Sequence, residues 1–411
     1  MSFQSALSGL NASAKNLDVI GNNVANSTTV GFKGSQAEFS DMYANASGGS
    51  GGVTIGIGTS LAKVQQMFTQ GNITTTGNPL DMAINGGGFF RMDHLGLVNY
   101  SRDGQFSLDK NGYIVNSASD KLTGYLVNAN GTLNQSAPAP IQISSADIAP
   151  QVTGALGASG GVQAKLNLDS RSGNLVTASF NIGNSATYTS ATSVSVFDSL
   201  GNQHALSMYF IKTAANSWDM ITALDGVVIG APTVKTLAFS GAGALTTAMP
   251  YAGVTVALAN GATTPLAFNL DFTGTTQYGS PFAANSLNQD GYAPGRLAGY
   301  NIGSDGTILG RYSNGQSKTL GQVVLANFSN PNGLNSLGGN AWAESIDSGT
   351  PLVGVAGTGK NGAIQAGAVE DANVDVTNEL VKMITAQRIY QSNAQSIKTQ
   401  DSVLQTLVNL R

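Results

Sequence analysis

The sequence NVDVTNELVKMITAQRIYQSNAQSIKTQDSVLQTLVNLR, residues 373–411, contains neither Pro nor Gly, although the whole chain has 52 Gly. On a seven-residue frame its seam positions alternate in steps of four and three, as in a coiled coil. One position holds Val376, Met383, Tyr390, Ile397 and Leu404, and the other holds Leu380, Gln387, Ala394, Asp401 and Val408. Asp375 is a suitable N-cap for this stretch. The pattern predicts one long helix whose apolar stripe needs a partner.

A second stripe lies at the start of the chain, where a helix is expected to fade around residues 22–26. Its members, again four and three residues apart, are Phe3, Leu7, Leu10, Ala14, Leu17, Gly21 and Val24. A helix packed on the core of its own domain would show the same pattern. Because both chain ends carry such seams and the long middle does not, we expect residues 1–30 and 371–411 to form one coiled-coil-like inner domain.

The composition excludes several classes of protein. Only 10% of the 411 residues are charged, against about 25% in ordinary soluble domains, and the net charge is −4. A nucleic-acid binder would show a basic face instead. With no Cys there are no disulfides, thiolate metal sites or Cys nucleophiles. The start of the chain lacks the pattern of a secretory signal, and no apolar run approaches the ~18 residues of a membrane helix.

The middle of the chain has β character, so the expected fold class is α+β with two nested, mainly antiparallel β domains. Residues 31–70 form a connecting segment. Turn pairs at Asp103-Gly104, Asn111-Gly112, Asp305-Gly306 and Asn314-Gly315 separate short alternating runs, which is typical of hairpins. We expect an inner β domain from residues 71–150 and 285–370. An outer β domain, residues 151–284, is inserted into it.

One segment resembles a phosphate-binding loop. Residues 354–361, GVAGTGKN, nearly match G-x-x-x-x-G-K-[ST], in which Lys360 would reach the outer phosphates. However, Asn361 replaces the hydroxyl that holds Mg²⁺, and the following residues do not start a helix. We therefore interpret the segment as a linker loop and expect no cofactor.

The sequence offers no candidate for acid–base or nucleophilic catalysis. The two histidines, His94 and His204, are far apart in sequence and lie beside predicted turns, so each is interpreted as a solvated turn residue. No carboxylate pair or metal-ligand spacing stands out. An enzyme is therefore not expected, and no catalytic, cofactor-binding or metal-binding residue is assigned.

The two chain ends resemble the bacterial flagellar rod and hook axial proteins. Near the start the resemblance is carried by SGLNA (8–12), LDVIGNNVAN (17–26) and GFK (31–33). Near the end it is carried by ELVKMITAQR (379–388), YQSN (390–393) and IKTQD (397–401). Within that family, the length and the segments YSRDGQF (100–106) and GQVVLANF (321–328) are most similar to hook subunits.

This resemblance implies a structural subunit of the flagellar hook, which self-assembles into a curved, flexible tube that couples rod to filament and transmits torque. The implied partners are many copies of the chain itself, the rod, the hook cap, the hook–filament junction and the type III export proteins. The implied location is extracellular, at the basal-body end of the flagellum, after export without a cleaved signal peptide. The expected assembly-interface residues are Phe3, Leu7, Leu10, Leu17, Val24, Val376, Leu380, Met383, Tyr390, Ile397, Leu404 and Val408.

Two alternatives remain open at this stage. A distal rod-type axial protein would share both terminal motifs but is shorter and lacks the large inserted domain. A secreted β-rich adhesin would keep its binding function after loss of both terminal helices. A separate alternative concerns the helices alone, whose seam residues could pack on the core of their own domain instead of on other copies.

Overall fold

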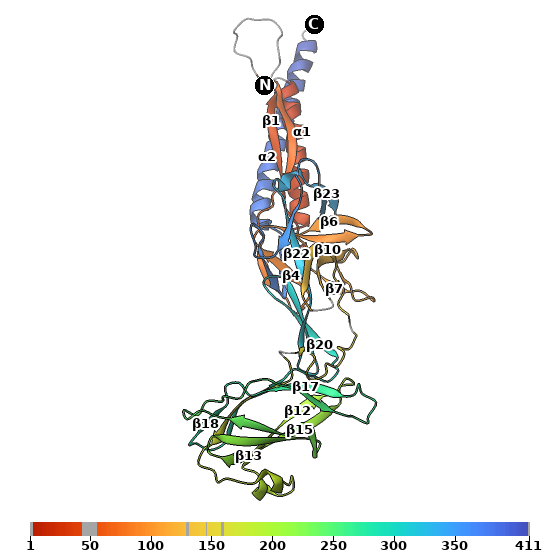
Figure 1. The fold of residues 1–411 in the computed structure, drawn as a ribbon. Coiled ribbons are helices and arrows are strands. Elements are labelled where there is room, and N and C mark those ends of the chain that lie inside the picture. Colours follow the sequence, from red (N-terminus) through yellow and green to blue (C-terminus); the bar gives the residue numbers. More distant parts are fainter. Residues whose placement is uncertain (1–2, 43–55, 129–130, 145, 158–159, 410–411) are drawn as a thin grey trace. The chain divides into compact units, whose positions relative to one another are not determined.

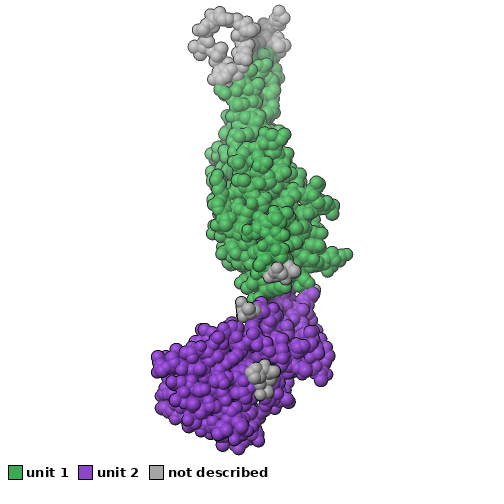
Figure 2. Space-filling view, in the orientation of Figure 1, with its two compact units in different colours: residues 1–144, 299–311, 317–411 green, residues 145–298, 312–316 purple. Residues whose placement is uncertain are grey.

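The computed structural model describes residues 3–42, 56–128, 131–144, 146–157 and 160–409 of the chain. It contains two long helices and many short, mostly antiparallel strands (Figure 1), which confirms the α+β class. The chain divides into two compact units, shown in different colours in Figure 2. Unit 1 comprises residues 1–144, 299–311 and 317–411, and unit 2 comprises residues 145–298 and 312–316. Residues 43–55 of the predicted connecting segment lie outside the described residues.

The two helices of unit 1 are α1 (Phe3–Ala25) and α2 (Val376–Asn409), which pack side by side in opposite directions. Asn23 near the end of α1 contacts Glu379 near the start of α2, whereas Gly9 lies against Asn393. The predicted N-cap is confirmed, because Asp375 Oδ1 accepts hydrogen bonds from the backbone N–H groups of residues 377 and 378 at 2.9 and 3.2 Å. Strands β1 (Ser35–Met42) and β2 (Gly58–Gln66) pair antiparallel and pack against α1 (Figure 1).

The β part of unit 1 is built on a 12-stranded sheet. Its main path runs β20 (Leu297–Ile302), β21 (Thr307–Tyr312), β22 (Ser317–Asn327), β9 (Lys121–Val127), β5 (Phe89–His94), β6 (Leu97–Ser101), β24 (Ala341–Ala343) and β23 (Asn335–Gly338). Off this path lie β7 (Ser107–Leu108), β8 (Ile114–Val115), β10 (Leu133–Pro140) and β25 (Leu352–Val355). Two further pairs are β4 (Met82–Asn85) with β26 (Ala363–Ala366) and β3 (Ile73–Thr75) with β27 (Ala368–Glu370).

An aromatic cluster forms part of the unit 1 core. Phe89 and Tyr100 from neighbouring strands pack with Phe328 and Trp342. Phe68, which follows β2, meets Phe89 edge to face at 5.5 Å between ring centroids and Trp342 at 5.6 Å. Edge-to-face pairs of this kind bring the positive ring edge to the negative ring face. The segment that leads from the helices into the sheet is therefore anchored in the core.

Unit 2 contains two sheets that share one hydrophobic core. The first is formed by β12 (Ser190–Phe197), β13 (Gln203–Ala214), β14 (Ser217–Leu224) and β15 (Val227–Ala238). The second is formed by β16 (Tyr251–Val256), β17 (Leu266–Asp271), β11 (Val162–Asp169), β18 (Thr276–Tyr278) and β19 (Ala283–Gln289). Alternate residues of β11 and β17 point into the core, as the two-residue period of a strand requires.

Most predicted hairpin turns are confirmed, and one is wrong. Asn111-Gly112 joins β7 to β8, Asp305-Gly306 joins β20 to β21, and Asn314-Gly315 joins β21 to β22. Asp103-Gly104 instead lies in the extended link between β6 and β7. Gly is required there by packing, because a Cβ on Gly104 would lie 1.7 Å from the carbonyl oxygen of Met82.

Candidate assembly surface

The face along which α1 meets α2 differs by one residue from the predicted seam. The buried residues of α1 are Ala6, Ser13, Ile20 and Asn23. Each directly precedes a predicted seam residue, and the same offset holds on α2, where Glu379 and Ala386 are buried. One residue corresponds to a rotation of about 100° around the helix axis. The leucine-rich stripe of α1 is therefore turned away from the centre of the helix pair.

Small and polar side chains explain why α1 and α2 meet along this face and not along the predicted seam. A Cβ on Gly9 would lie 2.8 Å from Asn393 Nδ2, so the Asn393 side chain occupies the space that a larger residue would need at this point. Asn23 Nδ2 donates to Glu379 Oε2 at 3.2 Å and to the carbonyl oxygen of Ser35 at 2.8 Å. These buried polar groups satisfy one another, as burial requires. The buried face of α1 therefore holds small and polar residues together with a single large apolar residue, Ile20.

The predicted interface residues lie along the flanks of this pair. Those exposed are Phe3, Leu7, Val376, Leu380, Tyr390 and Leu404, and those half-buried are Leu10, Leu17, Val24, Met383 and Ile397. The side chain of Val408 lies outside the described residues. The two polar seam residues, Gln387 and Asp401, are exposed, so neither belongs to a core private to the chain. Participation of these residues in assembly stays a prediction.

The sequence reasoning missed several exposed apolar residues on α2, namely Val381, Ile384, Ile389 and Val403. Each is next to a seam residue in the sequence but holds neither seam position, so a search restricted to those positions could not find them. Val381 and Ile389 line a groove of about 380 Å³ together with Val19, Ile20 and Phe39. The apolar surface of α2 is thus wider than a two-position seam.

A buried ionic cluster connects the end of α1 and the start of α2 to the β part of unit 1. Glu370, the last residue of β27, contacts Lys33 Nζ through Oε1 at 2.7 Å and Arg102 Nη1 through Oε2 at 2.9 Å. Lys33 Nζ also donates to the carbonyl oxygen of Thr69 at 2.8 Å. The side chains of Lys33 and Glu370 have 0% exposure. The cluster therefore joins the segment that follows α1 to the strand that precedes α2.

Burial dominates the electrostatics of this cluster. It lowers the pKa of the Lys33 ammonium and of the Arg102 guanidinium, because an apolar surrounding disfavours a charge. The negative charge of Glu370 opposes both shifts and keeps the two cations paired. Lys33 is the last residue of the segment GFK (31–33). That segment carries part of the family resemblance, which did not predict the buried ion pair of its lysine.

The segments considered for chemistry are structural. Residues 354–361 comprise the end of β25 and the turn after it, in which the N–H of Asn361 donates to the carbonyl oxygen of Thr358 at 3.0 Å. Strand β26 follows this turn, whereas a phosphate-binding loop opens a helix, which favours the linker-loop interpretation. His94 is half exposed and contacts Asp120.

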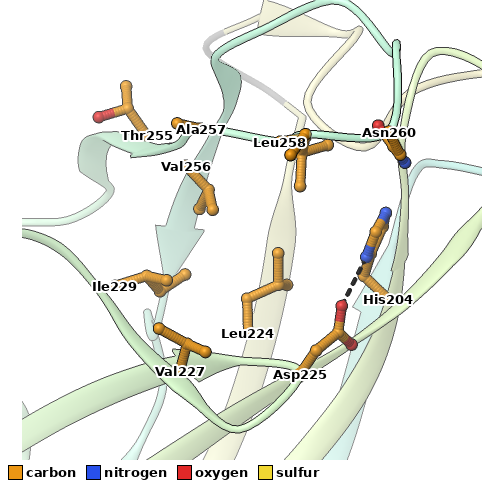
Figure 3. Close-up of a pocket in the computed structure, with 11 residues that line it drawn as sticks. His204, Leu224, Asp225, Val227, Ile229, Thr255, Val256, Ala257, Leu258 and Asn260 are labelled. Atoms are coloured by element: carbon orange, nitrogen blue, oxygen red, sulfur yellow. Dashed lines mark hydrogen bonds and ion pairs between the residues drawn. The ribbon is translucent and has the colours of Figure 1, made fainter.

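The interpretation of His204 as a solvated turn residue is wrong. Its Nδ1 lies 2.7 Å from Asp225 Oδ2, and its Nε2 lies 3.4 Å from Asp198 Oδ2. Its side chain is mostly buried, at one end of a hollow of about 580 Å³ in unit 2 (Figure 3). Leu224, Val227 and Ile229 line one side of that hollow. Burial disfavours the imidazolium, but the two carboxylates outweigh it and raise the pKa of His204.

The raised pKa of His204 predicts how the stability of unit 2 depends on pH. The protonated imidazole stabilises the folded state fully below its unfolded pKa of about 6.5, and this contribution is lost as pH rises through the higher folded pKa. His204→Gln should cost about 1–3 kcal/mol of unfolding free energy at pH 6, through loss of charge-assisted hydrogen bonds, and less at pH 9.

This prediction can be checked by denaturant unfolding in a Trp342→Phe background, where Trp218 reports on unit 2. The chain has two Trp, so the signal then comes from one residue. His94→Gln serves as the matched control and should show no such pH dependence in the Trp218 signal. An equal cost of His204→Gln at both pH values would contradict a protonated His204.

Comparison with known proteins gives matches to flagellar families along most of the chain. At the two ends, residues 3–33 match the family "Flagella basal body rod protein" and residues 365–410 match "Flagellar basal body rod FlgEFG protein C-terminal". Residues 83–164 match "Flagellar hook protein FlgE/F/G D1 domain", and residues 167–292 match "Flagellar basal body protein FlaE D2 domain". These matches define a structural protein of the flagellar axis.

Full-length relatives narrow the class further. The flagellar hook protein FlgE of Escherichia coli K12 is 45% identical over 419 residues, with 100% of both chains covered. That of Rhizobium meliloti is 34% identical over 420 residues, covering 100% of this chain and 98% of the relative. The chain belongs to the flagellar hook protein FlgE family. It is a structural subunit of the flagellar hook and not an enzyme.

A solved structure has a similar fold. The crystal structure of the Helicobacter pylori flagellar hook protein FlgE2 matches with a TM-score of 0.53 at 14% identity. The match covers 71% of this chain and 99% of that one. Among the described residues, no helix is both long and apolar enough to span a bilayer.

Proposed function

We propose that copies of this chain polymerise through α1 and α2 into the tube of the hook, which bends while it transmits torque from rod to filament. In this proposal residues 1–30 and 371–411 form a coiled-coil-like inner domain, and residues 31–70 connect it to the outer layers. The inner β domain, residues 71–150 and 285–370, carries the inserted outer β domain, residues 151–284. Contacts between unlike surfaces of successive copies produce an open helical polymer when the rotation between copies does not close into a ring.

The observation that carries this proposal is the exposed apolar surface on the helix pair. Its large apolar residues are Phe3, Leu7, Val376, Leu380, Val381, Ile384, Ile389, Tyr390, Val403 and Leu404. Soluble monomers rarely expose large contiguous apolar patches, and such patches mark interaction sites. The predicted interface residues, including half-buried Leu10, Leu17, Val24, Met383 and Ile397, lie on or beside it. Neighbouring copies would cover this surface.

The unequal lengths of the helices support the same proposal. Helix α2 has 34 residues and α1 has 23. Since Gly9 lies against Asn393 and Asn23 against Glu379, the start of α1 reaches only to about residue 399 of α2. The following residues, including Val403 and Leu404, therefore extend past the partner helix of their own chain. Packing against other copies would bury them.

The family membership supports the finer assignments of partners and location. We propose contacts with the rod, the hook cap and the hook–filament junction, and passage through a type III export channel without a cleaved signal peptide. The tube would lie outside the cell, at the basal-body end of the flagellum. The distal-rod and adhesin alternatives lose support, because the chain matches hook proteins along its full length.

Electron microscopy of the purified protein after salting-out tests the proposal. Short tubes with a central channel are the expected result. Intact, folded protein that yields only amorphous aggregate or monomer across a full series of salt concentrations would contradict it.

A further inference from the structure

The turn between β5 and β6 carries an unusual residue. His94 and Leu97 form the last pair of the hairpin, and Leu95 and Gly96 make the two-residue turn. Leu95 has a φ of 53° and Gly96 a φ of 92°, which is the left-handed region at both positions. The side chain of Leu95 is in open solvent, with 94% of the residue exposed, and Leu97 is 70% exposed. A bulky aliphatic residue is uncommon in this backbone conformation.

A second hairpin of the chain shows what this turn ordinarily contains. Between β14 and β15, Asp225 (φ 49°) and Gly226 (φ 84°) make the same two-residue turn after the pair Leu224 and Val227. Asp-Gly and Asn-Gly are the favoured pairs there, because a short polar side chain tolerates the left-handed region. Leu95 thus replaces the residue type that would suit the fold of the monomer.

Nothing in the turn depends on the leucine side chain. The N–H of Gly96 donates to Asp93 Oδ1 at 2.8 Å, which closes the loop with a carboxylate. His94 contacts Asp120, which directly precedes β9, and Asp93 lies opposite Lys121 where β5 pairs with β9. The hairpin is therefore held firmly at its base while its two leucines project into solvent.

We propose that Leu95 and Leu97 form a contact knob that is buried against a second copy of this chain in the polymer. The inference rests on the proposed function, which supplies neighbouring copies at fixed positions around every subunit. The left-handed backbone conformation of Leu95 costs free energy, and its exposed side chain offsets none of that cost within the chain. Burial of the two leucine side chains in a neighbour offsets the cost in the assembled state.

The decisive variant is Leu95→Asn, because Asn-Gly suits this turn better than Leu-Gly does. The monomer should unfold at an equal or higher temperature than the wild type. The critical concentration for tube formation should rise at least about tenfold through loss of apolar burial. Leu337→Asn, which removes an exposed leucine from another hairpin of unit 1, is the matched control and should change it by less than about threefold.

If Leu95→Asn forms tubes at the same critical concentration as the wild type, the proposed contact knob is wrong, whereas the proposed function still stands. Absence of tubes from the wild-type protein overturns both. A second measurement uses the absence of Cys in the chain, since a fluorophore on Leu95→Cys labels one position. Its accessibility to a soluble quencher should fall by several-fold when Leu95→Cys is copolymerised with excess wild type. Equal accessibility in monomer and polymer overturns the proposal.

Discussion

Replacement of Glu370 by Gln is expected to lower the free energy of unfolding of unit 1 by about 3–5 kcal/mol, since loss of one partner leaves buried charges unpaired. The carboxylate of Glu370 contacts Lys33 Nζ at 2.7 Å and Arg102 Nη1 at 2.9 Å. It also accepts a hydrogen bond from the N–H of Gly71 at 2.8 Å. Gln preserves the shape of the side chain but cancels its charge, so two cations remain buried beside each other.

The pH dependence of this defect follows from Lys33. Burial already lowers the pKa of its ammonium, and Glu370 opposes that shift. In the variant the pKa of Lys33 falls further below its value in the unfolded state. The unfolded state then binds more protons than the folded state does. Folding of the variant therefore becomes more favourable as pH rises. The difference between variant and wild type should therefore be smaller at pH 9 than at pH 6.

Denaturant unfolding in a Trp218→Phe background measures this effect, because Trp342 then reports on unit 1 alone. Glu38→Gln is the matched control. Glu38 pairs with Lys63 at 3.5 Å on the surface, so its loss should cost no more than about 0.5 kcal/mol. A cost below about 1 kcal/mol for Glu370→Gln would show that the cluster does not hold the helix ends to the sheet.

The double substitution Leu380→Ser and Ile384→Ser is expected to raise the critical concentration for tube formation about a hundredfold. These residues lie one helical turn apart on α2 and are 44% and 52% exposed in the single chain. Completing their burial in a neighbour is worth roughly 1–2 kcal/mol each, and about 3 kcal/mol per subunit corresponds to a factor of about 100. The free energy of unfolding of the monomer should fall by about 1 kcal/mol or less, mainly through the lower helix propensity of Ser.

The control for this prediction is the pair Gln391→Ser and Gln395→Ser, which has the same spacing on the same helix. Both glutamines are exposed, so the control has a similar propensity cost without removing apolar surface. Sedimentation of polymer across a concentration series gives the critical concentration, and circular dichroism gives monomer stability. Wild-type assembly of the double variant, or equal damage to assembly and to the monomer, would contradict an assembly role for this face.

Local features of the structure were predictable from the sequence because they depend on neighbouring residues. The absence of Gly and Pro from residues 373–411 and the N-cap at Asp375 specify where α2 begins and that it continues. Asn-Gly and Asp-Gly pairs marked three hairpin turns, since backbone conformation there is a local property. Family motifs at the two ends identified the class of protein.

The orientation of the helices depended on tertiary packing. Periodicity showed an apolar stripe on each helix but not what would cover it. The close approach of Gly9 to Asn393 places small residues in the centre of the pair, so the stripes turn outward by about one residue. For the same reason Gln387 and Asp401, which looked like defects in a seam, are solvent-exposed in the single chain.

The sequence by itself determined two terminal helices, a β-rich middle and a structural rather than catalytic protein. Tertiary structure alone decided which charges are buried together, because Lys33, Arg102 and Glu370 lie far apart along the chain and meet only when the sheet forms. It also decided that His204 lies between two carboxylates and that the large apolar residues of α2 stay uncovered. The physical reason is that hydrogen bonding and helix propensity act between near neighbours, whereas burial is a property of the whole fold.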